Sequence, residues 1–174
     1  SSPLRSRFSG GVYRLEFYTE EELAEIIRRS AKILGVETSR GAEKAIAKRA
    51  RFTPRTANYF LKRARDYAQV HKTPLDDDAV TEALKLLGVD DVGLTPSDRK
   101  LLQTMAEKFS GGPVGLGTLA AALSEEEATI EEFNEPYLIQ LGLIERTPRG
   151  RMLTVNGYKH IGLTPPKNLQ NKLL

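Results

Sequence analysis

Three arginines fall within one short stretch of the sequence, and their spacing suits the binding of phosphate groups. Arg146, Arg149 and Arg151 surround a turn in which Pro148 fixes the backbone φ angle and Gly150 permits a left-handed conformation. Apolar residues on both sides provide stems, so the stretch predicts a tight β-hairpin with three guanidiniums around its tip. Guanidiniums stay charged and donate several hydrogen bonds, which makes this tip a candidate phosphate-binding surface.

A second candidate anion site lies where a helix is expected to begin. Thr53 is a good N-cap, Pro54 suits the first helical position, and Arg55 follows in the first turn. Unpaired backbone N–H groups and the positive helix end favour phosphate there, and the Arg55 guanidinium adds charge. Residues 40–65 hold nine basic residues and one acid, Glu43, so the segment favours an anionic neighbour. For most of these side chains a solvated helical face explains the pattern equally well.

The first half of the chain predicts a compact module of four helices. The first helix has a capping box of Thr19 and Glu22 and stops at Gly35. The other helices are expected over residues 39–51, from residue 53 onwards, and from the acidic run at 76–78 to about residue 88. Apolar residues recur at helical spacing in this region, so these helices should share a small core.

After an acidic connection over residues 89–94, the order of signals becomes helix, turn, helix and β-hairpin, which is that of a winged helix. The helices are expected over residues 95–109, 117–123 and 129–142. Thr129 and Glu132 should form the capping box of the third helix, and Pro136 should kink it. The arginine-rich hairpin is then the wing.

The acidity of the third helix decides which surface should meet a nucleic acid. Residues 124–137 contain six glutamates and no basic residue, whereas duplex DNA carries about one negative charge per 1.7 Å. We therefore expect the wing to contact the DNA backbone, without dependence on base sequence. The third helix is not expected to read bases. Arg146 and Arg151 are predicted as the main contacts and Arg149 as a secondary one. A solvated hairpin tip is the alternative.

Composition excludes several classes of protein. The chain has no cysteine and only two histidines, which removes disulfides, thiolate catalysis and cysteine-bound zinc, and makes a histidine metal site unexpected. No apolar run reaches the roughly 18 residues of a transmembrane helix, and the N-terminus lacks a signal-peptide pattern. We therefore expect a cytoplasmic protein without a membrane partner. The net charge of +3 indicates an anionic partner only weakly.

The N-terminal residues suggest the end of a different domain. Residues 12–18 alternate in the manner of a β-strand, but a lone strand cannot bury itself. We therefore expect residues 1–18 to be the last part of a sheet domain. The helical module then covers residues 19–92, the winged helix residues 93–163 and a tail residues 164–174.

Several motifs resemble those of RuvB-type Holliday-junction branch-migration motors, which are AAA+ ATPases. In the second half they read GGPVG from residue 111, TIE from 129, EPYL from 135 and RTPRGR from 146. In the first half, PLRSRF from residue 3 and RFTPR from 51 resemble the end of the family's ATPase core and its sensor motif. The resemblance implies a mainly α fold: a four-helix AAA+ lid and a winged helix that follow the last strand of an α/β ATPase core.

The resemblance also implies roles for residues near a nucleotide. Arg7 would be an arginine finger that reaches a neighbouring subunit's nucleotide, and Arg55 a sensor of the ATP γ-phosphate. Tyr18 and Pro54 would lie near the nucleotide, while ATP and Mg²⁺ would be bound mostly by a preceding core. Phe52 stands where the family usually has glycine. Because no G-x-x-x-x-G-K-[ST] loop occurs in the sequence, the chain alone is not expected to hydrolyse ATP.

The implied activity of the whole protein is ATP-driven branch migration of Holliday junctions in DNA recombination and repair. The resemblance implies a homohexamer that encircles duplex DNA, with RuvA loading it at the junction and the RuvC resolvase as an indirect partner. Two alternatives stand outside this activity: a non-enzymatic winged-helix DNA-binding regulator or adaptor, and a winged helix that binds only proteins. Base-specific binding would favour the regulator, and salt-insensitive binding of a partner would favour the latter.

Overall fold

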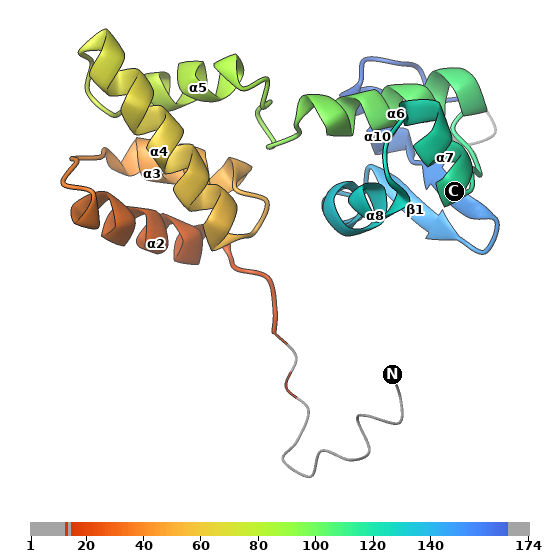
Figure 1. The fold of residues 1–174 in the computed structure, drawn as a ribbon, viewed down its shortest axis with the longest axis horizontal. Helices are drawn as coiled ribbons and strands as arrows, with labels where there is room; N and C mark the ends of the chain where they lie inside the picture. The colour runs from red at the N-terminus through yellow and green to blue at the C-terminus, as the bar shows by residue number, and fades with distance from the viewer. Residues whose placement is uncertain (1–12, 14, 167–174) are drawn as a thin grey trace. The chain divides into compact units, whose positions relative to one another are not determined.

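The computed structural model describes residue 13 and residues 15–166 of the 174-residue chain. The chain divides into two compact units, residues 1–83 and residues 84–174 (Figure 1). Each unit has its own buried core. Among the described residues, no helix combines the length and the apolar character that crossing a membrane requires. The predicted mainly α fold with a small β-hairpin is confirmed.

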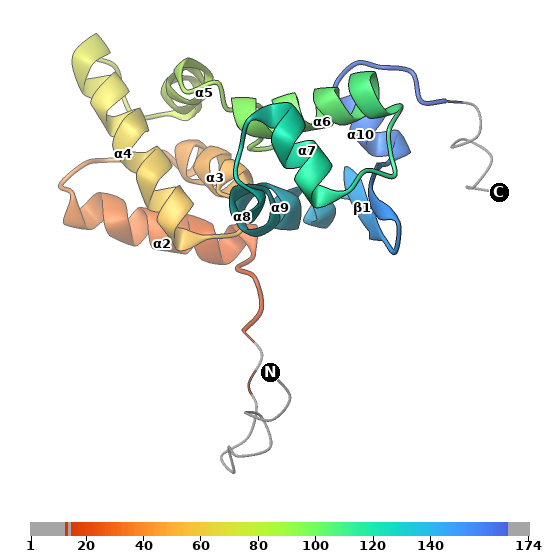
Figure 2. The ribbon, with the colours of Figure 1, turned by 45° about the vertical axis from the view of Figure 1, so that its right-hand side comes forward.

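The first unit is a bundle of helices. Their bounds are α2 (Glu20–Ile33), α3 (Arg40–Arg49), α4 (Pro54–His71) and α5 (Asp77–Leu86), the last of which runs on into the second unit. Helix α2 packs against α3, and α4 contacts both, as Figures 1 and 2 show. The fully buried Leu23, Ile46 and Leu61 come from these three helices, and each such side chain contributes about 1.5–3 kcal/mol through burial.

Polar residues define where these helices begin. Thr19 and Glu22 form the predicted capping box of α2, in which Thr19 Oγ1 accepts a hydrogen bond from the Glu22 N–H at 3.2 Å. Ser39 caps α3 and Thr53 caps α4 in the same way, and Pro54 begins α4. These side chains satisfy N–H groups that have no partner inside the helix. The first three predicted helix starts are thus confirmed.

The strand expected over residues 12–18 is wrong for the part of it that the structure describes. Residues 13 and 15–18 form no strand, and the side chains of Tyr13 and Leu15 are exposed. A strand is held by hydrogen bonds to a neighbouring strand, and no described residue provides such a neighbour here. Instead, the ring of Phe17 lies 6.0 Å from the ring of Phe52, next to the start of α4.

The second unit combines short helices with one hairpin. Its elements are α6 (Pro96–Phe109), α7 (Leu116–Leu123), α8 (Glu127–Thr129), η1 (Ile130–Asn134), α9 (Glu135–Gln140), β1 (Ile144–Thr147), β2 (Gly150–Leu153) and α10 (Val155–His160). Helix α6 contacts α7, β2 and α10, and Figure 2 shows α7 and α10 beside it. Its side chains Leu101, Leu102 and Met105 are buried in the core.

The third helix of this winged helix starts earlier than predicted. It consists of α8, the π-helical turn η1 and α9 in succession, and it begins at Glu127. Thr129 has helical φ and ψ angles of −61° and −44°, whereas a capping residue has extended ones. The predicted capping box of Thr129 with Glu132 is therefore wrong. The turn η1 interrupts the regular α-helix just before Pro136, whose missing N–H and bulky ring fit poorly inside one.

The hairpin has the predicted tight tip. Its antiparallel register pairs Thr147 with Gly150 and leaves Pro148 and Arg149 in the loop. Val114 lies along the other edge of β2 and exchanges two backbone hydrogen bonds of 2.8 and 2.9 Å with it. Gly150 has a φ of +133°, and a Cβ at this position would lie 2.4 Å from the Val114 carbonyl oxygen. The close approach of these two chains therefore requires glycine.

Helix α10 is absent from the elements expected from the sequence. Thr154 caps it by accepting a hydrogen bond from the Gly157 N–H at 3.0 Å. Gly157 lies so close to the Leu143 carbonyl oxygen that a Cβ would approach it to 2.2 Å. The helix has six residues, which is too short for an apolar period to identify it.

Candidate nucleic-acid interface

Arg149 occupies the exposed tip of the wing. Its backbone N–H donates a hydrogen bond to Thr147 Oγ1 at 3.3 Å, and that hydroxyl donates to the Gly150 carbonyl at 2.9 Å. These bonds fix the loop. The Arg149 guanidinium forms no ion pair with any residue that the structure describes, so it is available to an anion from solution.

The two arginines of the hairpin stems face the third helix, where both bond to Glu135. Arg146 Nε donates to Glu135 Oε1 at 2.8 Å, while Arg151 Nε and Nη2 donate to Glu135 Oε2 at 3.2 and 2.9 Å. The Glu135 side chain is 2% exposed and that of Arg151 is 13% exposed. The structure therefore separates the three predicted arginines, because one points into solvent and two close over a buried carboxylate.

Opposite charges keep this cluster ionised. Burial alone would raise the pKa of Glu135, but hydrogen bonds from Arg146 and Arg151 outweigh burial and hold that pKa below its usual range. Hydrogen bonds to Glu135 and Glu131 raise the pKa of Arg146. Sequence reasoning missed Glu135, since its partners lie 11 and 16 residues away on other elements. No spacing rule for helices or strands connects residues at such separations.

A second, half-exposed carboxylate contacts the same arginines. Glu131 Oε1 accepts a hydrogen bond from Arg146 Nη2 at 2.8 Å and lies 3.8 Å from Arg151 Nη2. The side chains of Glu131 and Arg146 are 48% and 51% exposed. Two of the six glutamates over residues 124–137 are thus paired with the wing. The remaining ones are exposed; they are Glu125, Glu126, Glu127 and Glu132.

The first turn of α4 presents Arg55 to solvent. Arg55 is exposed and forms no ion pair with a described residue. Thr53 Oγ1 caps the helix at 3.4 Å from the Thr56 nitrogen, and Pro54 is half-buried beside it. Phe52, just before the cap, has a φ of +55°, which costs a bulky residue about 1–2 kcal/mol and which glycine adopts freely.

Two further residues expected near a nucleotide, Tyr18 and Arg7, lie far from Arg55 in the sequence. Tyr18 is exposed and precedes α2, on the segment whose Phe17 meets Phe52. Arg7 lies outside the described residues. Among the described residues, no group of three or more His, Asp or Glu side chains could hold a metal ion. The N–H groups and guanidinium at the start of α4 suit a phosphate and would not ligate Mg²⁺.

The basic segment over residues 40–65 is partly neutralised inside the first unit. Its one acid, Glu43, is buried and accepts hydrogen bonds from Arg28 at 3.0 and 3.1 Å, while Arg63 and Arg65 pair with Asp66 at 3.0 and 2.7 Å. The exposed basic residues without a partner among the described residues are Arg40, Lys44, Lys48, Arg55 and Lys62.

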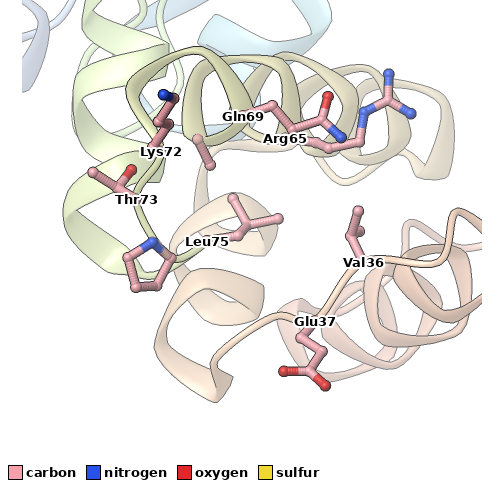
Figure 3. A pocket seen from close by; sticks show the side chains of 9 residues that line it. Val36, Glu37, Arg65, Gln69, Lys72, Thr73 and Leu75 are labelled. Carbon is pink, nitrogen blue, oxygen red and sulfur yellow. The ribbon is translucent and has the colours of Figure 1, made fainter.

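A pocket of about 340 Å³ lies at the C-terminal end of α4. It is lined by Val36, Glu37, Arg65, Ala68, Gln69, Lys72, Thr73, Pro74 and Leu75 (Figure 3). A helix rises 1.5 Å per residue, so the ten steps from Arg55 to Arg65, the first residue of α4 that lines the pocket, correspond to roughly 15 Å. The pocket is therefore separate from the anion site at the start of α4, and Arg65 is the one lining residue that belongs to the basic segment over residues 40–65.

Two family models match the chain. The model described as the RuvB AAA lid domain matches residues 18–90, and the model described as the RuvB C-terminal winged helix domain matches residues 91–162. The boundary between the two models falls a few residues after the division between the compact units.

Relatives and solved structures agree with these models. The chain is 53% identical to the Holliday junction branch migration complex subunit RuvB of Treponema denticola, covering 96% of this chain and 49% of that protein. Its identity to the subunit of the same name from Koribacter versatilis is 54%, over 96% of this chain and 46% of that protein. The chain thus spans about half the length of these relatives. A solved structure of the Thermotoga maritima RuvB Holliday junction branch migration motor has 48% identity and a TM-score of 0.90, covering 95% of this chain and 56% of that one.

Proposed function

The chain belongs to the RuvB family, and from this premise we propose that it forms the lid and the DNA-contacting part of an ATP-dependent branch-migration motor. The relatives are named as subunits of the Holliday junction branch migration complex. The exposed wing tip is the observation that carries the DNA-binding part of the proposal, since the acidic third helix beside it disfavours base reading.

In the proposed contact, the wing binds the phosphate backbone of duplex DNA. Arg149 makes the main phosphate contact, because its guanidinium is exposed and bonds to no described residue. Arg146 contributes through its half-exposed face, whereas Arg151 is mostly covered and serves mainly to hold the wing on Glu135. This order differs from the one the sequence suggested, in which Arg149 was secondary. Backbone contacts suit a motor that must move along any sequence, because phosphates carry no sequence information.

The proposed role of the first unit is to respond to a nucleotide that the rest of the motor binds. Arg55, at the start of α4, is proposed to stabilise charge on the transferring phosphoryl group, with Pro54 and Tyr18 near the nucleotide and Arg7 acting on the neighbouring subunit. When bound, ATP would supply the free energy and Mg²⁺ on its phosphates would neutralise developing charge. Both would be bound mostly by a core outside this chain, so the chain alone is proposed to be inactive as an ATPase.

The family also suggests the assembly. We propose a cytoplasmic homohexamer around duplex DNA, loaded at a Holliday junction by RuvA, with the RuvC resolvase as an indirect partner in recombination and repair. The whole assembly, and not a single subunit, would have helicase activity.

A salt titration of the wing tests the DNA contact. Arg149→Ala should weaken binding to two unrelated duplexes equally and reduce the slope of log affinity against log salt by about 0.9, the loss of one phosphate contact. Lys159→Ala removes one charge from an exposed position on α10 and serves as the control. An unchanged slope for Arg149→Ala would contradict the wing contact. A loss confined to one duplex would favour the sequence-reading regulator.

A further inference from the structure

Glu131 occupies the position in which the wing would receive a phosphate. Its Oε1 lies 2.8 Å from Arg146 Nη2 and 3.8 Å from Arg151 Nη2, and its side chain is half-exposed. A phosphate oxygen bonds to arginine at the same distances and in the same geometry as a carboxylate oxygen. The two anions therefore compete for the same N–H groups.

Glu131 and Glu135 hold the arginines in different ways. Glu135 is almost wholly buried and accepts from the Nε atoms of both arginines, so it fixes the stems of the hairpin to α9. Glu131 is half-exposed, and its strongest contact is the Arg146 Nη2 atom at the surface. Exposed ion pairs of this kind are weak, because water competes for both partners. Glu131 can therefore release Arg146 while Glu135 keeps it in place.

We propose that Glu131 is an internal substitute for a DNA phosphate, which occupies Arg146 in the free protein and gives way when the duplex binds. This role rests on the proposed wing contact with DNA, and it makes Glu131 a residue that limits the affinity of that contact. Each binding event must break the bond between Glu131 and Arg146, so the affinity for every duplex is lowered. A contact weakened in this way is released readily, which suits a protein that must advance along DNA.

Neutralising Glu131 while keeping its shape tests the proposal. Glu131→Gln in the 174-residue chain should bind duplex DNA about two- to fivefold more tightly than Glu132→Gln, which corresponds to the strength of an exposed ion pair. Glu132 is the matched control: it is the next residue, is exposed, and pairs with no described residue. The salt slope of Glu131→Gln should also become steeper by up to about 0.9, because Arg146 then gains a full phosphate contact.

A double substitution separates the proposed exchange from a general change of charge. In an Arg146→Ala background, Glu131→Gln should bind no more tightly than Glu132→Gln, since the competed guanidinium is gone. Equal affinities of the two single variants, or weaker binding by Glu131→Gln, would overturn the inference even where Arg149→Ala supports the wing contact. If neither the wild type nor any variant binds duplex DNA, the proposed function and this inference fail together.

Discussion

Replacing the buried carboxylate of the wing should destabilise the second unit. Glu135→Gln keeps the side-chain shape but removes the charge and one acceptor oxygen. Arg146 and Arg151 currently donate three hydrogen bonds to this carboxylate, and the amide nitrogen of glutamine cannot accept any of them. At least one of the two guanidiniums therefore loses its partner while it stays held against the protein.

The size of the loss follows from the exposure of the three groups. Removing one partner of a fully buried ion pair costs about 3–5 kcal/mol. Arg146 is half-exposed and keeps Glu131 as a partner, whereas Arg151 is mostly buried. We therefore expect Glu135→Gln to lower the free energy of unfolding by less than a fully buried pair would, about 2 kcal/mol. For a unit of this size, such a loss lowers the melting temperature by about 8–16 °C.

The pH dependence gives the sharper test. Because the folded-state pKa of Glu135 is lowered, its stabilisation is fully present above the unfolded-state value of about 4.3 and is lost as the pH falls through the lower folded value. Calorimetry should therefore show a constant difference in unfolding free energy between wild type and Glu135→Gln from pH 5.5 to 7.5. Below about pH 4 this difference should shrink. Glu132→Gln should stay within about 0.5 kcal/mol of wild type. Equal melting temperatures at pH 7, or a difference independent of pH, would refute the reasoning.

Three further predictions concern the hairpin and the proposed nucleotide contacts. Gly150→Ala should cost on the order of 3 kcal/mol in unfolding free energy, because the new Cβ meets the Val114 carbonyl, whereas Gly142→Ala, with positive φ but open space, should cost about 1 kcal/mol; equal losses would contradict the steric explanation. In the complete motor, Arg55→Ala should bind nucleotide yet hydrolyse ATP about 10³-fold more slowly, and near-normal steady-state turnover with DNA present would rule out the sensor role. Arg7→Ala should be inactive alone and should depress mixed hexamers below the activity expected from their wild-type fraction, which a subunit-mixing assay measures.

Local signals in the sequence predicted much of the fold. The capping box at Thr19 and the caps at Ser39 and Thr53 lie where helices begin, because these side chains act on N–H groups only three residues away. Thr129 has the same local pattern, yet it lies inside a helix. The helix already begins at Glu127, two residues upstream, so Thr129 is not in the position from which a side chain caps a helix.

The arrangement of the candidate site was less accessible, because it depends on contacts between distant residues. The hairpin and its tip follow from proline and glycine at fixed offsets, so the wing could be predicted. The direction of the stem arginines could not be predicted, because it is set by their hydrogen bonds to Glu135. These bonds depend on the packing of α9 against β1. From the sequence, Glu135 was one more repelling charge on an acidic helix; in the structure it is the group that holds the wing.

This pairing explains how an acidic helix can lie behind a surface proposed to bind DNA. Arg146 and Arg151 neutralise Glu131 and Glu135, so the four groups carry no net charge at neutral pH and the junction between helix and wing neither attracts nor repels a duplex strongly. Arg149 remains as a charge that projects from the tip, while Glu125, Glu126, Glu127 and Glu132, which pair with no described residue, disfavour an approach along the helix. On the proposed function, attraction at the tip and repulsion along the helix together orient the wing toward the phosphate backbone and keep the helix out of the groove.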